Sequence, residues 1–444
     1  MRYATHRTGR FQGAFRAPSD KSLTHRAYMF GAIADGVSRI RKPLRGEDCE
    51  STLSCMKQLG LRAEWVSADE VLLYAAPEWR QPEADLDCGN SGTTIRLISG
   101  LLASRPLVTR LIGDSSLSRR PMGRIAEPLR KMGAVIEGDR PPLTIHGSDS
   151  LHGITHQSPV ASAQVKSCLL LAGLRAQGST TVREPSLSRD HTERMLKAMG
   201  ARLISRGGGT PDISHPRAAI AVDTTHEVSI SAADSLKPFE FSVPGDISSA
   251  AFFLVAAAAI PASHLVLSEL SVNPTRTGIL DVLEDCGLSV QLGNLRDELG
   301  EPVADAELRG AGELKPFEIA GPLVPRLIDE IPVLAVLATQ CDGVTHIRDA
   351  AEMRVKECDR IEVMAEGLRR MGASIETHPD GMTITGPTPL TGTSVEAHLD
   401  HRIAMSFAVA GLLAEGETVI EGAESIATSF PGFQSELERL SVGA

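Results

Sequence analysis

The chain has 444 residues, a length that predicts two domains or a repeat architecture instead of one core. Its net charge of −11 and its 4% aromatic content argue against a general nucleic-acid or membrane-surface role. The seven cysteines include no C-x-x-C pair, which fits a reducing compartment. The longest apolar run, residues 250–260, is too short to span a bilayer, and the first residues carry no apolar signal region. We therefore expect a cytoplasmic globular protein with no nucleic-acid or membrane partner.

A helix-like segment that ends in an apolar residue and glycine recurs along the chain. It reads MKQLG, LRKMGA, LKAMGA, LEDCG and LRRMGA, and its glycines are Gly60, Gly133, Gly200, Gly287 and Gly372. Each glycine suits the position after a helix, and short β-like runs follow. A sixth candidate, LERLSVGA, closes the chain. Six units of this kind fill the length, which predicts a βαβ-rich module used six times, three per domain.

The first polar motif in chain order is PSDKSLTHR at residues 18–26, where a loop is predicted to turn into a helix over 23–33. A helix start offers unpaired N–H groups and a partial positive charge, so it suits an anion. Lys21 adds a compact charge there, and Ser22 and Arg26 fall one turn apart on the same face. For this segment alone, a capped helix with a solvated basic face is the alternative.

Two further predicted helix starts follow the same pattern. GNSGTTIR at residues 89–96 precedes an apolar helix, and its glycines allow a ligand to approach the backbone closely. In RRPMGR at residues 119–124, Pro121 fits the first helical position. Two arginines would then lie beside a positive helix end, an arrangement that repels itself unless an anion is present.

SAQVKS at residues 162–167 and SRDHTE at residues 188–193 open two more predicted helices. The first again offers polar groups at a helix start. In the second, the structural alternative is that Ser188 or Asp190 caps the helix while Arg189 and Glu193 pair at i,i+4.

The second half of the chain adds acids to the same theme. A hinge is predicted near residues 242–244, before an apolar helix. IDEIP at 328–332 places two carboxylates before another apolar helix, and DHRIAM at 400–405 opens a third. Within RVKECDR, Lys356 and Arg360 are predicted on one helical face with Glu357 beside them.

Positive charge is thus gathered locally in a chain that is acidic overall. Without a nucleic-acid signature, such clusters point to small, highly charged anions such as phosphates and carboxylates. The sequence shows no metal-ligand spacing, no Walker A motif and no Rossmann glycine motif after a strand. We therefore expect no metal and no cofactor.

Together these motifs resemble the enolpyruvyl transferase family, in particular its branch that acts on shikimate 3-phosphate. The matching segments run from residue 18 to residue 433: PSDKSLTHR, GNSGTTIR, RRPMGR, ASAQVKS, SRDHTE, PGDISSAAF, IDEIP, RVKECDRI, DHRIAM and SFPGF. The resemblance implies a two-domain α/β fold in which each domain has three βαβαββ units around a pseudo-threefold axis. It implies an active site in the cleft between a domain of residues 18–242 and a domain of residues 1–17 plus 243–444.

The resemblance also implies the reaction. The enolpyruvyl group of phosphoenolpyruvate is transferred to the 5-hydroxyl of shikimate 3-phosphate through a tetrahedral intermediate, and phosphate is released. The implied role is in the shikimate pathway, which leads to chorismate and aromatic amino acids. A free-standing monomer is expected, with glyphosate as an inhibitor.

The resemblance assigns roles to individual residues. Asp329 is the implied base at the 5-hydroxyl, Glu357 the implied proton donor to the methylene carbon, and Lys21 the third catalytic residue. The implied shikimate 3-phosphate contacts are Lys21, Ser22, Arg26, Ser162, Gln164, Arg189, Asp329 and Lys356. The implied phosphoenolpyruvate contacts are Lys21, Asn90, Gly92, Thr93, Arg96, Arg120, Gln164, Arg360 and Arg402.

This sequence departs from the family pattern at some positions. Residues 427–429 lack the lysine that many members carry before Phe430, so no lysine is assigned there. Glyphosate tolerance in one branch goes with alanine where this chain has Gly92, so we expect sensitivity.

Three other functions are alternatives to enolpyruvyl transfer onto shikimate 3-phosphate. The sister transferase for a UDP-amino sugar usually carries a cysteine in the loop before Arg-Pro, whereas residues 113–119 contain no thiol. An anion-binding module without turnover would gain nothing from Asp329 and Glu357. RNA 3′-phosphate cyclase shares the module, but the net charge of −11 disfavours it.

Overall fold

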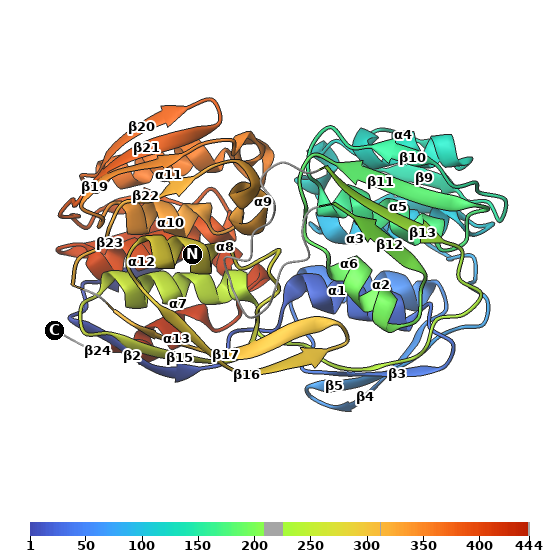
Figure 1. The fold of residues 1–444 in the computed structure, drawn as a ribbon, viewed down its shortest axis with the longest axis horizontal. Helices are drawn as coiled ribbons and strands as arrows, with labels where there is room; N and C mark the ends of the chain where they lie inside the picture. Colours follow the sequence, from blue (N-terminus) through green and yellow to red (C-terminus); the bar gives the residue numbers. More distant parts are fainter. Residues whose placement is uncertain (208–224, 311, 443–444) are drawn as a thin grey trace.

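The buried residues of this computed structural model form two separate hydrophobic cores. The structure describes residues 1–207, 225–310 and 312–442. One core is built from residues within 23–243, and the part of the molecule around it is called the first lobe. The other core is built from residues within 3–17 and 247–440 and defines the second lobe. The lobes lie side by side (Figure 1).

The described part of the first lobe contains three four-stranded sheets with one pattern of strand directions. In each sheet the first two strands are parallel and the remaining neighbours are antiparallel. The orders are β14 (Glu240–Ser242), β3 (Val37–Arg41), β5 (Glu70–Tyr74), β4 (Arg62–Ser67); β6 (Leu86–Asp87), β7 (Val108–Ile112), β9 (Leu143–His146), β8 (Val135–Glu137); and β10 (Thr155–Gln157), β11 (Ser179–Glu184), β13 (His226–Ser231), β12 (Leu203–Arg206).

Two helices belong to each of these sheets. The chain orders β6-α3-β7-α4-β8-β9 and β10-α5-β11-α6-β12-β13 are the expected βαβαββ unit. The unit that contains α1 and α2 is completed by β14, which comes from much later in the chain and pairs with β3. The helices are α1 (Lys21–Gly31), α2 (Glu47–Gln58), α3 (Gly92–Ala103), α4 (Gly123–Met132), α5 (Ala163–Gly173) and α6 (His191–Ala198).

The second lobe follows the same principle, because each of its sheets contains a parallel pair of strands. Helices join β18 to β19 and β22 to β23, whereas the first lobe lies between β2 and β15 in the chain. The sheets are β18 (Glu318–Ile319), β19 (Gly343–Ile347), β21 (Gly381–Gly386), β20 (Ser374–His378); β16 (Val290–Glu298), β17 (Glu301–Arg309), β15 (His264–Ser271), β2 (Arg10–Phe15), β24 (Ser441–Val442); and β1 (Arg2–His6), β23 (Glu417–Glu421), β22 (Ser394–Glu396). The helices are α7 (Ile247–Ala259), α8 (Gly278–Asp285), α9 (Val324–Leu327), α10 (Ile331–Ala338), α11 (Arg360–Arg370), α12 (His401–Leu413) and α13 (Phe433–Leu440).

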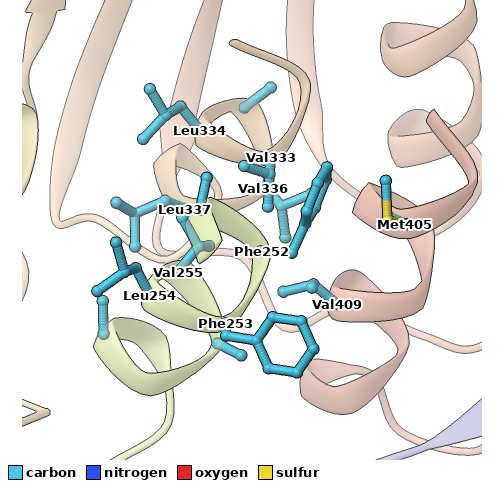
Figure 2. Close-up of a cluster of buried hydrophobic side chains, with 14 of the residues drawn as sticks. Phe252, Phe253, Leu254, Val255, Val333, Leu334, Val336, Leu337, Met405 and Val409 are labelled. Atoms are coloured by element: carbon cyan, nitrogen blue, oxygen red, sulfur yellow. The ribbon is translucent and has the colours of Figure 1, made fainter. Parts of the chain in front are cut away.

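Helices α7, α10 and α12 meet in the core of the second lobe. Figure 2 shows Phe252 of α7 among Val336 of α10 and Met405 and Val409 of α12. These helices are buried on nearly every side, which explains why their sequences are apolar all round instead of amphipathic. None of the helices in the described ranges is long and apolar enough to cross a bilayer.

The five glycines of the predicted repeat all have positive φ, between 91° and 118°. They follow α2, α4, α6, α8 and α11, and a β-strand begins within a few residues in each case. A left-handed glycine ends a helix and lets the chain turn back along the sheet. The repeat is therefore confirmed for these five units. Gly443, the glycine of the sixth candidate, lies outside the described residues.

The prediction that Pro121 occupies the first position of a helix is wrong. The 3-10 helix Leu117–Arg119 ends in an extended backbone at Arg120, and α4 begins only at Gly123. The N–H of Met122 donates to the carbonyl of Asp139 (2.8 Å), which holds the chain in this connection. Arg119 is therefore the last residue of the 3-10 helix, and Arg120 lies in the connection before α4.

The prediction of one helical face for Lys356 and Arg360 is also wrong. The 3-10 helix Ala351–Val355 ends before Lys356, whose backbone is not helical (φ −81°, ψ −148°), and α11 begins at Arg360. Asp359 caps α11 by accepting a hydrogen bond from the Glu362 N–H (3.2 Å). An aspartate before a helical run favours this cap, so the helix starts later than the spacing suggests.

Two chain segments cross between the lobes beside each other. The N–H of Asp20 donates to the carbonyl of Pro244, and the N–H of Asp246 donates to the carbonyl of Pro18, both at 2.8 Å. Elsewhere, Leu299 of the second lobe packs against the first core. The lobes are thus joined by paired backbone and by side-chain packing.

Candidate active site

Helices α1, α3 and α5 of the first lobe begin close together. Each start is capped by a side-chain oxygen, from Asp20, Ser91 and Ser162 respectively. The amide of Gln164 on α5 donates to Oγ1 of Thr93 on α3 (3.0 Å), which links two of these starts. Three helix N-termini therefore contribute partial positive charge to one region.

Arg26 of α1 lies almost fully buried among neutral partners. Its guanidinium donates to Oγ1 of Thr192 (2.8 Å), to Oγ of Ser167 (3.0 Å) and to the carbonyl of Ser22 (3.0 Å). Burial lowers the pKa of Arg26 to about 10, although nearby acids oppose the shift. A buried guanidinium held by neutral groups is stabilised further when an anion approaches.

Arg96 repeats this arrangement on α3. Its Nη1 donates to Oε1 of Gln164 (2.9 Å) and to the carbonyl of Gly92 (3.2 Å). Burial, followed by the charges of Arg120 and Arg124, lowers the pKa of Arg96 to about 10. The lowered pKa reports a cluster of positive charge that lacks full compensation.

Arg120 and Arg124 reach from the first lobe to the second. Nη2 of Arg120 donates to Oδ1 of Asn90 (2.7 Å) and lies 3.6 Å from Oε1 of Glu357. Arg124 pairs with Glu352 at 2.9 Å. The sequence analysis gave no role to this second pair, which joins residues 228 positions apart.

Lys21, the first residue of α1, pairs with a carboxylate that the sequence analysis did not find. Its Nζ lies 2.5 Å from Oδ2 of Asp48, in the first turn of α2. Burial lowers the pKa of Lys21, but Asp48 and more distant acids outweigh it and the net shift is upward. The sequence analysis singled out only the end of this helix, at Gly60, and gave no signal for Asp48.

Asp329 lies between α9 and α10 and contacts arginines of both lobes. Its Oδ2 accepts a hydrogen bond from Arg189 of the first lobe (2.7 Å), and its Oδ1 lies 3.4 Å from Nη1 of Arg360. Arg402 donates to the Asp329 carbonyl (3.3 Å). Burial raises the pKa of Asp329, but Arg402, Arg189, Lys356 and Arg360 lower it far more. The carboxyl is therefore ionised at neutral pH.

Glu357 and Asp400 hold the guanidinium of Arg360. Arg360 donates to Oε2 of Glu357 (2.7 Å) and to Oδ2 of Asp400 (2.8 Å), and its side chain is buried. Burial raises the pKa of Glu357, but Arg360, His401 and Arg120 outweigh it, so the net shift is downward. Asp400 is a second partner that the sequence analysis quoted in a motif without giving it a role.

Direct contacts join the predicted residues into separate groups. The group that crosses the two lobes contains Arg189, Asp329, Arg360, Glu357, Arg120 and Asn90. Arg96, Gln164 and Thr93 form a second group, and Lys21 and Arg26 bind partners of their own. Three other predicted residues take part in another way. Ser22 contributes its backbone carbonyl, and Ser162 uses its hydroxyl as a helix cap. Among the described residues the Lys356 side chain has no hydrogen bond or ion pair, but its charge helps to lower the pKa of Asp329. The structural alternative for residues 188–193 is wrong, because Arg189 pairs with Asp329 instead of Glu193.

The whole sequence also matches a known family. The sequence model of EPSP synthase (3-phosphoshikimate 1-carboxyvinyltransferase) matches residues 5–437. The chain belongs to the EPSP synthase family. It is therefore a transferase, and the enolpyruvyl transferase resemblance is confirmed.

Individual relatives of the EPSP synthase family agree with this assignment. A 3-phosphoshikimate 1-carboxyvinyltransferase from Bacillus cereus is 48% identical over 434 residues, 96% of each chain. One of the same name from a Synechococcus species is 49% identical over 443 residues, 97% of each chain.

Solved structures confirm the fold class. The EPSP synthase from Acinetobacter baumannii aligns with a TM-score of 0.87 and 41% identity, covering 100% of this chain and 99% of that one. The enolpyruvyl transferase NikO from Streptomyces tendae aligns with a TM-score of 0.77 and 19% identity, covering 98% of this chain and 96% of that one. The second likeness concerns the fold alone.

Proposed function

We propose that this chain transfers the enolpyruvyl group of phosphoenolpyruvate to the 5-hydroxyl of shikimate 3-phosphate and releases phosphate. The observation that carries the proposal is the position of Asp329. This carboxylate bridges Arg189 of the first lobe and Arg360 of the second, with a strongly lowered pKa. An ionised base surrounded by arginines suits a reaction between two anions.

The binding roles follow the lobes. We propose that residues 18–242 form one domain, residues 1–17 plus 243–444 the other, and that substrates bind between them. Lys21, Arg26 and Arg189 of the first lobe would hold the phosphate of shikimate 3-phosphate, and Arg26 is the most buried of the three. Arg120 of the first lobe and Arg360 and Arg402 of the second would hold phosphoenolpyruvate. The remaining binding residues of the sequence analysis are proposed in the same roles.

In the first chemical step, Asp329 would accept a proton. Because its pKa lies well below the usual range, its carboxylate is available to the 5-hydroxyl at neutral pH. The hydroxyl oxygen bonds to C2 of phosphoenolpyruvate while the methylene carbon receives a proton. The product of this step is the tetrahedral adduct, and Lys21 and the arginines stabilise its charge.

Glu357 is the proposed donor to the methylene carbon. Without a ligand its pKa is low because Arg360, His401 and Arg120 surround it. The carboxylate and phosphate of phosphoenolpyruvate would offset those charges and raise the pKa of Glu357, so that it can carry the proton. In the second step the C2–O bond to phosphate breaks and Glu357 takes one proton from the methyl group. The double bond forms again, and phosphate leaves with the proton that Asp329 had accepted.

The first experiment mixes the protein with shikimate 3-phosphate and phosphoenolpyruvate and measures released phosphate. A parallel reaction replaces the shikimate substrate with UDP-N-acetylglucosamine. Release with the shikimate substrate alone is expected. Release with the sugar nucleotide would contradict the proposed acceptor, and no release with either would support an anion-binding module.

The role of Glu357 has its own test. Solvent-hydrogen exchange into phosphoenolpyruvate is followed in the Glu357→Gln and Asp329→Asn variants. Exchange should be lost in the Glu357→Gln variant, because the amide cannot deliver a proton to carbon. Unchanged exchange in that variant would assign the donor role to another group.

Three further properties belong to the proposal. Glyphosate is proposed as an inhibitor at the phosphoenolpyruvate side of the site, beside Gly92. The enzyme is proposed to act as a monomer in the cytoplasm. Inhibition kinetics and sedimentation of the purified protein check the first two of these properties.

A further inference from the structure

We infer that Arg276 is a positioning residue that holds Lys21 in place through the joint between the two lobes. The inference rests on the proposed function, in which Lys21 contacts both substrates. Arg276 lies in the loop between β15 and α8 of the second lobe and is only 1% exposed. It belongs to none of the binding or catalytic groups described above.

Arg276 links carboxylates that belong to opposite lobes. Its Nη1 lies 3.5 Å from Oδ2 of Asp20, and its Nη2 lies 3.1 Å from Oδ1 of Asp246. Nη2 also donates to Oγ of Ser248 (2.5 Å), and Nη1 lies 3.3 Å from Nε2 of His191. Both ends of the guanidinium are therefore fixed, which a planar fork does better than an ammonium.

The two carboxylates are the caps of two helices. Oδ1 of Asp20 accepts the Leu23 N–H (2.8 Å) at the start of α1, which carries Lys21. Oδ1 of Asp246 accepts the Ser248 N–H (2.8 Å) at the start of α7. Figure 1 shows α1 and α7 on opposite sides of the lobe boundary. One buried arginine thus ties the starts of two helices from different lobes.

Lys21 itself is held from both lobes. Its backbone N–H donates to Oδ2 of Asp246 (3.4 Å), whereas its Nζ pairs with Asp48 of the first lobe. The crossing segments add two backbone bonds at the same place, between Asp20 and Pro244 and between Asp246 and Pro18. A shift of Asp246 would therefore move the backbone on which Lys21 stands.

Charge explains why the arrangement depends on Arg276. Asp20 and Asp246 are both buried, and burial, followed by the charge of Asp246, raises the pKa of Asp20. Burial also raises the pKa of Asp246, but Arg276 and Arg402 outweigh it and the net shift is downward. Burial lowers the pKa of His191 to about 3, so His191 is neutral at pH 7 and cannot offset them. Removing the arginine would leave two buried carboxylates facing each other, and buried charges without a partner are strongly unfavourable. The caps would move apart to relieve this repulsion.

The test compares three variants of the full chain. Arg276→Gln removes the charge. The double variant Arg276→Gln with Asp20→Asn removes one of the two carboxylates as well, and the Asn oxygen can still accept the Leu23 N–H at the start of α1. Ile145→Ala removes buried apolar volume from β9 in the first lobe without changing a charge. It serves as a control for lower stability alone.

Two measurements are made at a temperature where every variant is folded. In Arg276→Gln, kcat for phosphate release should fall about tenfold or more, because small displacements of catalytic groups cost that much. Amide hydrogen exchange at residues 18–23 should accelerate relative to that of α5. The double variant should recover at least about threefold of the lost kcat, and Ile145→Ala should keep kcat within about twofold.

Two results would overturn the inference. One is a kcat within twofold of the original in Arg276→Gln together with unchanged exchange at residues 18–23. The other is a loss that follows the melting temperature as in Ile145→Ala and deepens in the double variant, as expected of a merely structural residue. The exchange measurement does not depend on turnover. An unaltered protein that releases no phosphate would therefore contradict the proposed function, while exchange would still test the clamp.

Discussion

The two lobes treat their arginines differently. In the first lobe, Arg26 and Arg96 bond to hydroxyls, an amide and carbonyls, and burial lowers the pKa of each to about 10. In the second lobe, Arg360 is enclosed by Glu357, Asp400 and Asp329, and these carboxylates outweigh burial and raise its pKa. Arg26 and Arg96 of the first lobe thus keep a positive charge that no bonded carboxylate neutralises, whereas the charge of Arg360 in the second lobe is neutralised by carboxylates.

This difference shows how one site can both bind anions and keep two acids ready. An anion that enters the first lobe gains charged partners without displacing a carboxylate from Arg26. An anion that approaches Arg360 competes with Glu357 for the same guanidinium. That competition is useful, because it couples the arrival of phosphoenolpyruvate to the proton affinity of Glu357.

The largest expected effect is the loss of Asp329. In Asp329→Asn, kcat for phosphate release should fall about 10³-fold, within the usual range for a general base. The KM values of the two anionic substrates should not rise, because the amide can still hydrogen-bond to the 5-hydroxyl while Arg189 and Arg360 lose a competing carboxylate. Steady-state kinetics with each substrate varied in turn measures both quantities.

The matched control is Glu330→Gln, the neighbouring buried acid. Burial and the charge of Asp329 raise the pKa of Glu330, so replacing this carboxyl by an amide removes a charge that its surroundings disfavour. Its kcat should stay within about threefold of the original value. If Asp329→Asn showed the same modest loss, Asp329 would not be the base at the 5-hydroxyl. A rise in the KM of a substrate in that variant would show that the carboxylate serves to bind this substrate instead of accepting the proton.

The buried cluster around Glu184 in the first lobe also pairs its cation with carboxylates, and it predicts that the stability of the protein falls in acid. Glu184 is buried with Lys166 and His226, whose bonds and charge lower its pKa to about 2 against the effect of burial. Because the folded pKa lies below the ordinary 4.5, this stability is complete above pH 4.5 and is lost as pH falls toward 2. The loss amounts to roughly 3 kcal/mol.

Denaturant unfolding at pH 7 and at pH 3 measures this effect in the original protein and in Glu184→Gln. The variant should be less stable at pH 7, and it should lose less on acidification. Equal losses in the two proteins would mean that other carboxylates govern acid unfolding.

The sequence predicted the repeat and several of the polar helix starts, because both depend on local patterns. A glycine after a helix has a backbone reason, and cationic residues at helix starts are visible in order along the chain. What it could not predict are partners distant in sequence. Asp48 binds Lys21, and Arg276 lies between Asp20 and Asp246, yet nothing in the spacing of these residues indicates contact.

The two wrong helix starts have a common cause. Spacing at i,i+4 predicted a helical face for Lys356 and Arg360, but it did not weigh the cap at Asp359. Proline preference predicted a helix at Pro121, but the connection continues to Met122. Where a helix begins is decided by which backbone N–H groups find partners, and that competition is resolved only in three dimensions.

A moderate effect is expected from Arg26→Lys. The lysine keeps the charge but loses the fork that bonds to Thr192 and Ser167. The KM for shikimate 3-phosphate should rise roughly tenfold or more, which corresponds to the loss of one charge-assisted hydrogen bond. The KM for phosphoenolpyruvate should change less than about twofold. Equal increases for both substrates would contradict the division of binding between the lobes.

The control for this variant is Arg130→Lys. Arg130 also donates to carbonyls, those of Ile136 and Gly138, but at the end of α4, where it pairs with the exposed Asp139 as well (3.0 Å). Its substitution removes a comparable set of bonds, so any change of KM in this variant reports a general effect of the exchange.

The smallest expected effect concerns Gly92→Ala. A Cβ at this position would lie 2.5 Å from Nη1 of Arg96 and 3.3 Å from Nη1 of Arg120. Both atoms are the ends of flexible side chains, and Gly92 opens α3 without a positive φ, so the fold should tolerate the methyl group. The guanidinium of Arg96 would have to move aside, and that of Arg120 would have to shift by a few tenths of an ångström. An anion bound between the two groups would lose part of its contact with them.

Inhibition by glyphosate should therefore weaken about tenfold in Gly92→Ala, while the KM for phosphoenolpyruvate rises less. The difference is expected because a methyl group removes space, and the bulkier of two anions loses more contacts when a pocket shortens. Inhibition constants and KM values of both proteins, measured in one buffer, decide the matter. Unchanged inhibition would show that Arg96 and Arg120 move aside freely. The hydrogen bonds of these two side chains would then hold them less rigidly than the structure indicates.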